Sequence, residues 1–513
     1  MKKLWILLLC LCVFGCKKTE NFQLTVIHTN DLHAHILPFN DYEDCDVNDT
    51  SCLGGFARLI TFMQNEKRQN PHAIFLDAGD RFTGTAYYVL TKSRYLLPLF
   101  QMMPYDAATL GNHEFDDNLG DTTEFIKKWH TPIVDANIKP AENEALYPYI
   151  KPFVVLNKSG RKIGIIGVTT PHINILHGEK IAVLPIKKSV TESIAALKAQ
   201  GVNIIIVVSH IGLTADIKLA KALPDIDIIV GGHTHSLLIN DKQNKLRRAA
   251  YPLAVNNGKT LIVSSGMGGQ YVGKLQAEFD ADGHIISYNG DSLPMSSTIK
   301  NNEKALQIVT EAQQNANAIL SEKIADLPRA YGYTPDKNYC SEECPVGEYL
   351  AFLLAQENLG ADGVVLNSGA IRAALPAGEI NIGRILEIYP YDSPAVLIEL
   401  TGRKLQKYLR HGIVHYRKKN KTNELLQTAG IRYEFTADNK EIRHITISGQ
   451  ELNPNKTYTI LTSRFLADGG DGFPVMPYKD TGKTVREILI KQLKNPHNRR
   501  YEPQNNVRVY NRL

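Results

Sequence analysis

Short apolar runs alternate with amphipathic segments through the first half of the chain. Most runs are four to six residues long, which is typical of strands that are buried on both faces. Helical patterns lie between them, for instance at 56–65 and 190–199. Strands that alternate with helices predict a layered α/β domain. The predicted strands are residues 24–27, 73–76, 107–110, 162–168, 203–208, 226–230 and 260–263.

The second half of the chain has its own system of apolar runs. Between the two halves, apolar residues within 306–316 recur at helical spacing, which predicts a connecting helix. We therefore expect one domain at 22–297, a linker helix at 298–325 and a second, smaller α/β domain at 326–513. The later runs are residues 350–354, 363–366, 395–400, 404–409 and 458–461.

Composition and charge exclude several classes of protein. The chain has 513 residues, of which 43% are hydrophobic and 22% are charged. This composition is that of an ordinary globular protein, and it excludes a mainly disordered, collagen-like or coiled-coil chain. The 58 basic and 53 acidic residues leave a net charge of +5, which creates no strong field when it is spread over this length. We therefore expect no nucleic-acid partner.

The first sixteen residues have the pattern of an export signal. Lys2 and Lys3 precede an apolar stretch at 4–14 that is too short to span a bilayer comfortably. The stretch ends in Gly15 and Cys16, and it resembles the bacterial lipoprotein signal. That resemblance implies a signal peptide at 1–15, cleavage before Cys16 and a lipid on Cys16. Cleavage would remove two lysines and lower the net charge from +5 to +3.

We therefore expect an exported protein. The lipid would anchor it to the bacterial envelope, on its periplasmic face or at the cell surface. An ordinary signal peptide and an uncleaved anchor are the alternatives. The lipid is the only membrane contact that we expect, and the sequence does not indicate an oligomeric state.

Four cysteines remain after the signal segment, and they fall into two local pairs. The short spacings favour disulfides between Cys45 and Cys52 and between Cys340 and Cys344. Such bonds persist in an oxidising compartment, which agrees with export. Free thiols and metal ligands are the alternatives. Neither pair has a histidine or a second cysteine pair close in sequence, which weakens the metal alternative.

Polar residues of the kinds that bind metals follow five predicted strands of the first domain. A single histidine after a strand is weak evidence for a metal site, but seven such donors together are strong evidence for one. Because α/β sheets place their sites beyond the carboxyl ends of strands, we expect these side chains to converge on one crevice. Imidazole nitrogens with carboxylate and amide oxygens favour Zn or Mn over a thiolate zinc site. The donors are Asp31, His33, Asp80, Asn112, His210, His233 and His235.

The chemistry that suits this donor set is hydrolysis of a phosphoester by two divalent ions. Two ions about 3.5–4 Å apart can clamp a displacement at phosphorus, and they lower the pKa of bound water. They also neutralise the charge that builds on the phosphate oxygens. A bridging carboxylate would help to hold two cations this close together, and Asp80 is the candidate.

Several motifs follow one another in a fixed order along the chain. They are Thr29-Asn30-Asp31-Leu32-His33, Gly79-Asp80, Gly111-Asn112-His113-Glu114-Phe115-Asp116, His210, Gly232-His233-Thr234-His235 and Leu466-Ala467-Asp468-Gly469-Gly470-Asp471-Gly472-Phe473. This order resembles that of the calcineurin-like metallophosphoesterases, and the first, third and last motifs look like the 5′-nucleotidase family. The resemblance runs from about residue 22 to the end of the chain. It implies an N-terminal metallophosphoesterase domain, with helices packed on a two-sheet β core, and a smaller C-terminal α/β domain for substrate recognition.

The resemblance implies a role for each donor. The first ion would be held by Asp31, His33, Asp80 and His235, and the second by Asp80, Asn112, His210 and His233. By the same resemblance, His113 would stabilise the transition state and assist the leaving group, and Asp116 would orient it. The spacing of three residues independently allows a hydrogen bond that selects the tautomer of His113. Asp116 as a plain loop cap is the alternative, and Asp117 competes for its role.

Five residues of the second domain match substrate contacts of the family. A glycine-containing turn after a strand lets backbone N–H groups approach an anion, and a nearby arginine can bind phosphate in a bidentate manner. By resemblance, Phe465 would stack on the base and Asp471 would hold the ribose hydroxyls. The implied substrate contacts are Asn367, Gly369, Arg372, Phe465 and Asp471.

Two stretches depart from the pattern of the family. Leu425 stands where a second aromatic residue stacks on the base, and Ser341, Glu342 and Glu343 stand where an arginine binds phosphate. Neither departure affects the metal chemistry, but both leave the substrate open.

We therefore expect an exported two-metal hydrolase that releases phosphate from nucleoside 5′-monophosphates. A 2′,3′-cyclic nucleotide phosphodiesterase or a nucleotide-sugar hydrolase on the same site is one alternative. A catalytically silent, nucleotide-binding surface lipoprotein is another. The resemblance also implies a rotation of the second domain that delivers substrate to the metals.

Overall fold

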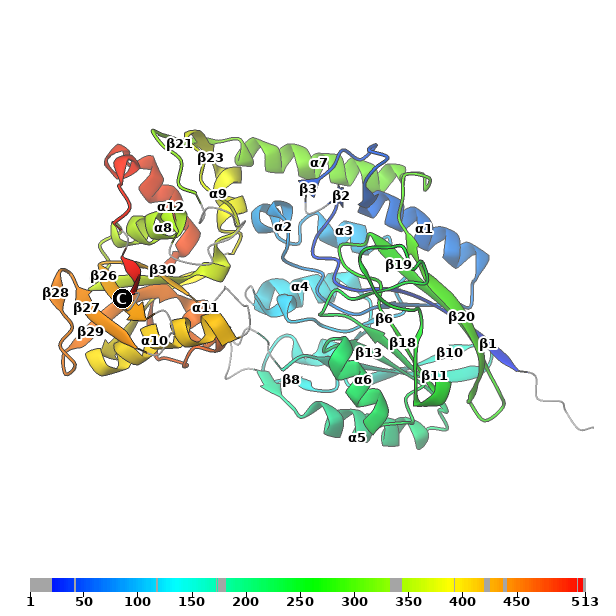
Figure 1. Ribbon diagram of the computed structural model, residues 1–513. Helices are drawn as coiled ribbons and strands as arrows, with labels where there is room; N and C mark the ends of the chain where they lie inside the picture. The colour runs from blue at the N-terminus through cyan, green and yellow to red at the C-terminus, as the bar shows by residue number, and fades with distance from the viewer. Residues whose placement is uncertain are drawn as a thin grey trace, which may run out of the picture.

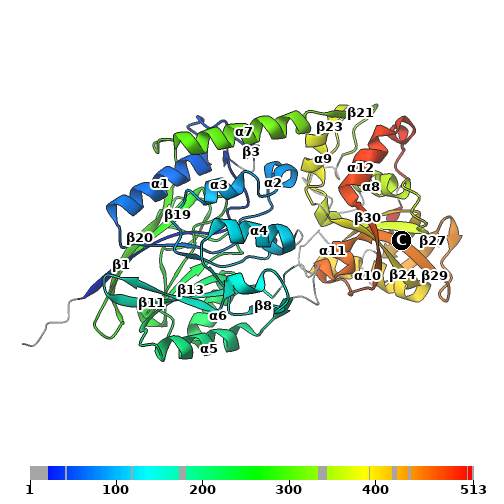
Figure 2. The same cartoon turned by 180° about the vertical axis from the view of Figure 1, so that it is seen from behind.

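The computed structural model has a larger and a smaller lobe, and a long helix joins them along one side (Figures 1 and 2). The structure describes residues 21–510, except 41–42, 117–118, 172, 174–180, 333–343, 392, 419–424, 437–440 and 505. The predicted signal peptide and Cys16 lie outside the described residues, as do Asp117, Cys340 and the stretch from Ser341 to Glu343.

Two sheets form the centre of the larger lobe, and in each the central strands run parallel. In spatial order, the first sheet contains β20 (Ile285–Pro294), β19 (Tyr271–Phe279), β1 (Phe22–Thr29), β5 (Ile74–Asp77), β6 (Ala107–Ala108), β7 (Ile133–Val134) and β9 (Ile150–Lys151). The second contains β10 (Phe153–Lys158), β11 (Arg161–Thr169), β13 (Ile204–His210), β14 (Ile228–Gly231), β18 (Thr260–Val263) and β17 (Leu253–Val255).

The side chains of these strands alternate between two cores, which is why the strands are apolar throughout. Val26 and Ile74 of the first sheet pack against Ile206 and Val230 of the second, so the two sheets face each other. The neighbouring Ile27 points the other way, into a core shared with helices. Helices cover both outer faces, and the predicted layered fold on a two-sheet core is confirmed. The helices are α1 (Phe56–Gln69), α2 (Ala86–Thr91), α3 (Leu96–Phe100) and α4 (Leu119–Trp129) on the first sheet and α5 (Ile186–Lys198) and α6 (Leu213–Ala222) on the second.

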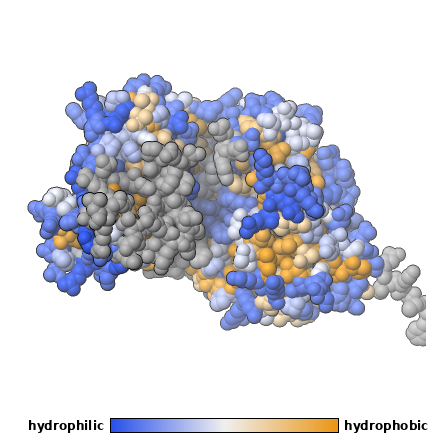
Figure 3. Space-filling view, in the orientation of Figure 1, coloured by the Kyte–Doolittle hydropathy of each residue, from blue (hydrophilic) through white to orange (hydrophobic). Residues whose placement is uncertain are grey.

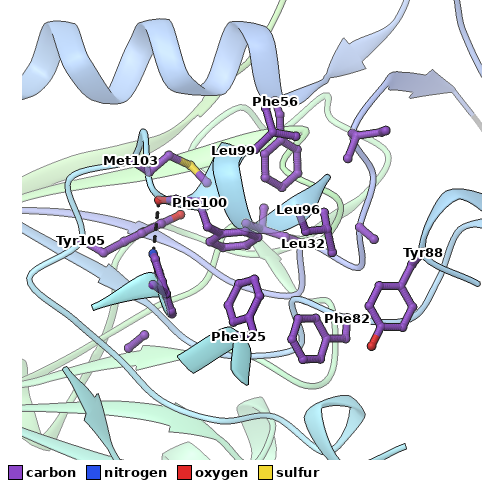
Figure 4. Close-up of a cluster of buried hydrophobic side chains, with 14 of the residues drawn as sticks. Leu32, Phe56, Phe82, Tyr88, Leu96, Leu99, Phe100, Met103, Tyr105 and Phe125 are labelled. Carbon is purple, nitrogen blue, oxygen red and sulfur yellow. Dashed lines mark hydrogen bonds between the residues drawn. The ribbon is translucent and has the colours of Figure 1, made fainter. Parts of the chain in front are cut away.

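Aromatic rings fill the space between the helices and the first sheet (Figure 4). The ring of Phe100 lies at the centre, 5.5 Å from Phe56, 5.7 Å from Phe125 and 5.2 Å from Trp129 between ring centroids. Leu32 is fully buried in the same cluster. Because Leu32 stands between two predicted metal ligands, this packing anchors the loop after β1. Figure 3 shows hydrophobic residues gathered on part of the larger lobe, with hydrophilic residues around them.

The long helix α7 (Glu303–Leu320) lies within the predicted linker and packs on the larger lobe. Ala305, Val309, Ala312 and Ala316 are fully buried there, at helical spacing. The side-chain oxygen of Asn302 accepts a hydrogen bond from the backbone N–H of Ala305 at 3.1 Å and caps the helix. Among the described residues, no helix is long and apolar enough to cross a membrane.

The smaller lobe begins with β21 (Lys323–Leu327) and has a sheet with cores on both faces. In spatial order this sheet contains β25 (Leu426–Ala429), β22 (Gly363–Asn367), β29 (Thr457–Ser463), β24 (Pro394–Thr401) and β30 (Tyr478–Thr484). Helices α8 (Pro345–Ala355), α9 (Ile382–Ile388) and α12 (Val485–Lys494) cover one face. The other face packs on α10 (Gly402–Lys418), α11 (Arg464–Ala467) and a sheet of β28 (Gln450–Glu451), β27 (Ile442–Ile447), β26 (Ile431–Thr436) and β31 (Val507–Tyr510).

One of the two predicted disulfides lies within the described residues. Cys45 and Cys52 are bonded, and their loop is held to α1 by Arg58, whose buried guanidinium donates to the carbonyl of Cys52 at 2.7 Å. Cys344 is disulfide-bonded as well, but its predicted partner Cys340 lies outside the described residues.

A buried carboxylate ties together three elements of the smaller lobe. Glu357 follows α8, and its side chain is 1% exposed. It accepts hydrogen bonds from Lys483 of β30 and, at 2.7 and 2.5 Å, from Lys491 and Gln492 of α12. Burial opposes ionisation, but these hydrogen bonds outweigh it and lower the pKa of Glu357 to about 2.

Replacing Glu357 by Gln is expected to destabilise the smaller lobe by about 1–3 kcal/mol at neutral pH, because buried donors lose a charged acceptor. The stabilisation is complete above the ordinary glutamate pKa of about 4.3 and is lost as the pH falls toward the folded value. The difference in melting temperature between the wild type and Glu357→Gln should therefore narrow below about pH 4. Glu387→Gln, which removes an exposed ion pair with Arg384, is the control and should change little. Equal effects of the two substitutions would contradict this account.

Candidate metal centre

Five strands of the larger lobe deliver polar side chains to one place. Each ligand predicted from the sequence stands at or just beyond the carboxyl end of its strand. Asp31 and His33 follow β1, Asp80 follows β5, Asn112 follows β6, His210 ends β13, and His233 and His235 follow β14. The first three of these strands belong to one sheet and the last two to the other. The centre therefore lies where the carboxyl edges of the two sheets meet.

The loops that carry these donors have an unusual backbone. Positive φ angles are uncommon for residues other than glycine and cluster at functional sites. Five of the predicted ligands have them, namely Asp31 (50°), His33 (46°), Asp80 (55°), His233 (76°) and His235 (50°).

Glycine is required at position 111 by the close approach of the loop after β5. A Cβ atom on Gly111 would lie 2.0 Å from Oδ1 of Asp80. The backbone N–H of His113 donates to the same oxygen at 2.9 Å. Asn112, which stands between these two residues, is thereby held beside Asp80.

The donor atoms form two groups with Asp80 between them. In the first group, Nε2 of His235 lies 3.6 Å from Oδ1 of Asp31 and 3.0 Å from Nε2 of His33. In the second, Nε2 of His210 lies 3.0 Å from Oδ2 of Asp80, and His233 offers a further nitrogen. The same Oδ2 lies 3.8 Å from Nε2 of His33, which belongs to the first group. Asp80 is therefore placed to serve both groups.

The hydrogen bonds of the imidazoles leave nitrogens that point into the centre. Nδ1 of His33 donates to the carbonyl of Thr83 at 2.9 Å, and Nδ1 of His210 donates to that of Ala78 at 2.7 Å. Among the described residues, Oδ1 of Asn112 is one of the buried side-chain acceptors without a hydrogen-bond partner. Buried acceptors of this kind are costly unless something satisfies them. Divalent cations would do so, and the mixed N/O donor set suits them.

Charge is also unbalanced in the centre. Burial raises the pKa of Asp31 to about 7. Burial acts on Asp80 too, but the neighbouring imidazoles of His210 and His113 outweigh it and hold the pKa of Asp80 well below its usual range. In return, the Asp80 carboxylate overcomes the effect of burial and raises the pKa of His210 to about 9. Two carboxylates buried this close together need positive charge beside them, and divalent cations would supply it.

His113 lies at the open side of the centre. Its Nδ1 is hydrogen-bonded to Oδ2 of Asp116, and its Nε2 lies 4.0 Å from Oδ2 of Asp80. Burial would lower the pKa of His113, but the carboxylates of Asp80 and Asp116 raise it to about 10. The side chain is 31% exposed, so a proton on Nε2 is within reach of a ligand.

Asn30 supports the centre, although the sequence indicated no role for it. Its Nδ2 donates to Oδ2 of Asp31 at 2.7 Å, and its Oδ1 accepts from the backbone N–H of Ser265 at 2.9 Å. Asn30 thus joins the loop after β1 to a segment more than two hundred residues away. A polar residue directly after a buried strand is the signal that could have found it.

The smaller lobe brings together some of its predicted substrate residues. Nδ2 of Asn367, at the end of β22, donates to Oδ2 of Asp471 at 2.7 Å. Phe465 of α11 is 42% exposed, and its ring lies on Gly470, where a Cβ atom would be 2.4 Å from the ring. In Figures 1 and 2, α11 lies on the side of the smaller lobe that faces the larger lobe. Gly369 is in the turn that follows β22.

Arg372 has a partner that the sequence did not reveal. Its Nε donates to the hydroxyl of Tyr391 at 3.1 Å, and its guanidinium lies 5.6 Å from the centre of that ring. Leu425 is 1% exposed and belongs to the core of the smaller lobe, so it presents no face for stacking.

Comparisons with known proteins agree with this architecture. Residues 24–237 match the model for calcineurin-like phosphoesterases, and residues 324–478 match that for the C-terminal domain of 5′-nucleotidases. An apyrase from Tabanus yao is 30% identical over 517 residues, which cover 93% of this chain and 91% of the relative. A 5′-nucleotidase from Diplobatis ommata is 28% identical over 528 residues and covers 95% of this chain and 90% of its own length.

A solved structure supports the same assignment. The crystal structure of a 5′-nucleotidase precursor from Thermus thermophilus is similar, with 29% identity and a TM-score of 0.74, and covers 95% of this chain and 99% of its own. Calcineurin-like phosphoesterases use divalent metals, as the donor groups of the larger lobe would require. The chain belongs to the 5′-nucleotidase family and is a metal-dependent phosphoester hydrolase.

Proposed function

We propose that this protein is a two-metal phosphohydrolase that releases phosphate from nucleoside 5′-monophosphates. The observation that carries the proposal is the position of Asp80 between two groups of donors from two sheets. In this proposal Asp31, His33 and His235 hold one ion, Asn112, His210 and His233 hold the other, and Asp80 is shared. Zn and Mn fit the mixture of imidazole nitrogens and oxygens best. When bound, such ions activate water and neutralise charge on the phosphate oxygens.

His113 supplies the proton for the leaving group in this proposal. The Asp116 carboxylate accepts the proton of Nδ1 and stabilises the protonated imidazole, so that Nε2 is left to face the substrate. Nε2 then donates to the oxygen that departs from phosphorus.

Replacing His113 by Asn is expected to lower kcat by roughly 10²–10⁴-fold, because a positioned acid contributes about this much. Bound metal, measured by elemental analysis, should not change, since His113 is outside both ligand groups. Asp80→Asn, in contrast, should remove metal and activity together. His130→Asn replaces an exposed histidine of the same lobe that already has a positive φ, which Asn tolerates, and serves as the control. Undiminished kcat in His113→Asn would refute the assigned role.

Nucleotides are the proposed substrates because the smaller lobe presents Phe465 beside the paired Asn367 and Asp471. Phe465 offers a face for the base, and the carboxylate of Asp471 offers acceptors for ribose hydroxyls. The absence of a second stacking face at Leu425 favours a broader choice of substrate. A cyclic nucleotide phosphodiesterase or nucleotide-sugar hydrolase is therefore the second candidate.

A panel of substrates assayed with Zn and Mn added back separately tests the proposal. We expect phosphate release from nucleoside 5′-monophosphates, and Phe465→Ala should lower kcat/KM for them by roughly 5- to 150-fold, the range of one lost base stack. An aryl phosphate without a base should be hydrolysed equally by both proteins. Tyr147→Ala, which removes an exposed aromatic side chain of the larger lobe, is the control. Turnover of only cyclic nucleotides or nucleotide sugars would establish the second candidate, and no turnover with metal bound would indicate a silent binding protein.

Export and lipid anchoring at Cys16 are part of the proposal. The N-terminal pattern supports them, and so does the disulfide between Cys45 and Cys52. Intact mass of the mature protein from a bacterial envelope should equal residues 16–513 plus a diacyl or triacyl modification. A mass that retains residues 1–15, or that lacks lipid, would contradict anchoring.

A further inference from the structure

Glu114 has no role in the metal and substrate contacts described above, yet its carboxylate joins two metal-binding loops. The side chain is 1% exposed. Its Oε2 accepts hydrogen bonds from the backbone N–H of Asp80 at 3.0 Å and of Gly111 at 2.5 Å. Its Oε1 accepts from the backbone N–H of Arg81 at 2.7 Å. One buried carboxylate thus receives three donors from the loops that follow β5 and β6.

A buried ion pair extends this connection toward β1. Nη1 of Arg81 donates to Oδ1 of Asp77 at 2.5 Å, and Nη2 lies 3.6 Å from Oε2 of Glu114. The other oxygen of Asp77 accepts from the hydroxyl of Thr29, the last residue of β1, at 2.7 Å. Asp77, Arg81 and Glu114 therefore form a network beneath three adjacent strand ends. The hydroxyl of Thr122 donates to the backbone carbonyl of Glu114 at 2.6 Å and helps to hold Glu114 in place.

The two loops need this support because their own backbone conformation does not provide it. Gly79 and Asp80 both have positive φ, so the chain leaves the sheet at this point and loses its ladder of hydrogen bonds. The N–H groups of Asp80, Arg81 and Gly111 would otherwise be buried donors without acceptors. The carboxylate of Glu114 accepts the hydrogen bonds that a neighbouring strand would otherwise accept. It thereby sets the distance between the loops that follow β5 and β6.

We infer that Glu114 is a positioning residue that assembles the second metal group, namely Asp80, Asn112, His210 and His233. This inference rests on the proposed two-metal function. Both oxygen donors of that group, Asp80 and Asn112, stand on the loops that Glu114 joins. The first group has separate supports, because Asn30 holds Asp31 and the carbonyl of Thr83 holds His33. Loss of Glu114 should therefore weaken the second ion more than the first.

Two substitutions separate the geometry of Glu114 from its charge. Glu114→Gln keeps the length of the side chain, but its NH₂ group must face at least one backbone N–H. Glu114→Asp keeps the charge opposite Arg81 and is too short to reach both loops. Asp106→Asn is the matched control, because Asp106 connects the same two strands at their amino ends. There it accepts from the backbone N–H of Phe75 at 2.9 Å and from Lys158 at 2.8 Å.

The test is a titration of the chelator-treated mature protein and these three variants with Mn²⁺. Bound Mn²⁺ per chain, the paramagnetic resonance spectrum and the melting temperature are measured. The wild type should bind two ions and show the spectrum of an exchange-coupled pair. Glu114→Gln and Glu114→Asp should bind the second ion roughly 10- to 100-fold more weakly, as occurs when partners of metal ligands are removed. Their spectrum should be that of a single ion, whereas Asp106→Asn should match the wild type in both respects.

Each other outcome has a distinct meaning. If both Glu114 variants bind two coupled ions with the affinity of the wild type, the inference is wrong. It is also wrong if Asp106→Asn loses the second ion to the same extent, because general destabilisation then explains the loss. A wild type that binds only one ion overturns the two-metal proposal itself, and the inference with it. If Glu114→Gln does not fold, the result for Glu114→Asp decides.

Discussion

Burial of two carboxylates beside one another is the constraint on which the larger lobe depends. Asp31 and Asp80 are almost fully buried and share a small volume with imidazoles from both sheets. Buried charge of one sign is tolerated only when cations or protons compensate it. The Asp80 carboxylate raises the pKa of His210, and divalent ions would supply positive charge at the same place. Several features around the centre keep these side chains together. They are glycines, residues with positive φ angles and buried hydrogen bonds.

Much of the fold could be predicted from the sequence because buried parallel strands have a simple signature. Runs such as 204–208 are apolar on both faces, and the polar residue that follows each run stands at the edge of the sheet. The linker helix was equally clear from the spacing of Val309, Ala312 and Ala316. Strand β6 is shorter than its predicted run at 107–110, since it ends at Ala108.

The partners of the site residues could not be predicted in the same way. Asn30 meets Ser265, and Glu114 meets the N–H groups of Asp80 and Arg81, across long separations in sequence. No local pattern encodes such contacts, since they exist only after the strands that carry the two partners have come together. The hydrogen bond between Arg372 and Tyr391 spans fewer residues, but no sequence pattern indicated it either. The motif that contains Glu114 was visible, but its hydrogen bonds were not.

In the proposed mechanism the two lobes have separate tasks. The seven proposed metal ligands lie in the larger lobe, and the exposed ring of Phe465 lies in the smaller one. Under this proposal, a change such as Leu425 alters the choice of substrate and leaves the metal centre as it is. In the proposed mechanism the smaller lobe must bring a phosphoester to His113, which lies at the open side of the centre.

Anomalous diffraction from crystals soaked in Mn²⁺ measures the central claim most directly. The account predicts two peaks about 3.5–4 Å apart on either side of the Asp80 carboxylate. One peak should be bounded by Asp31, His33 and His235 and the other by Asn112, His210 and His233. A single peak, or peaks that lie away from Asp80, would contradict it.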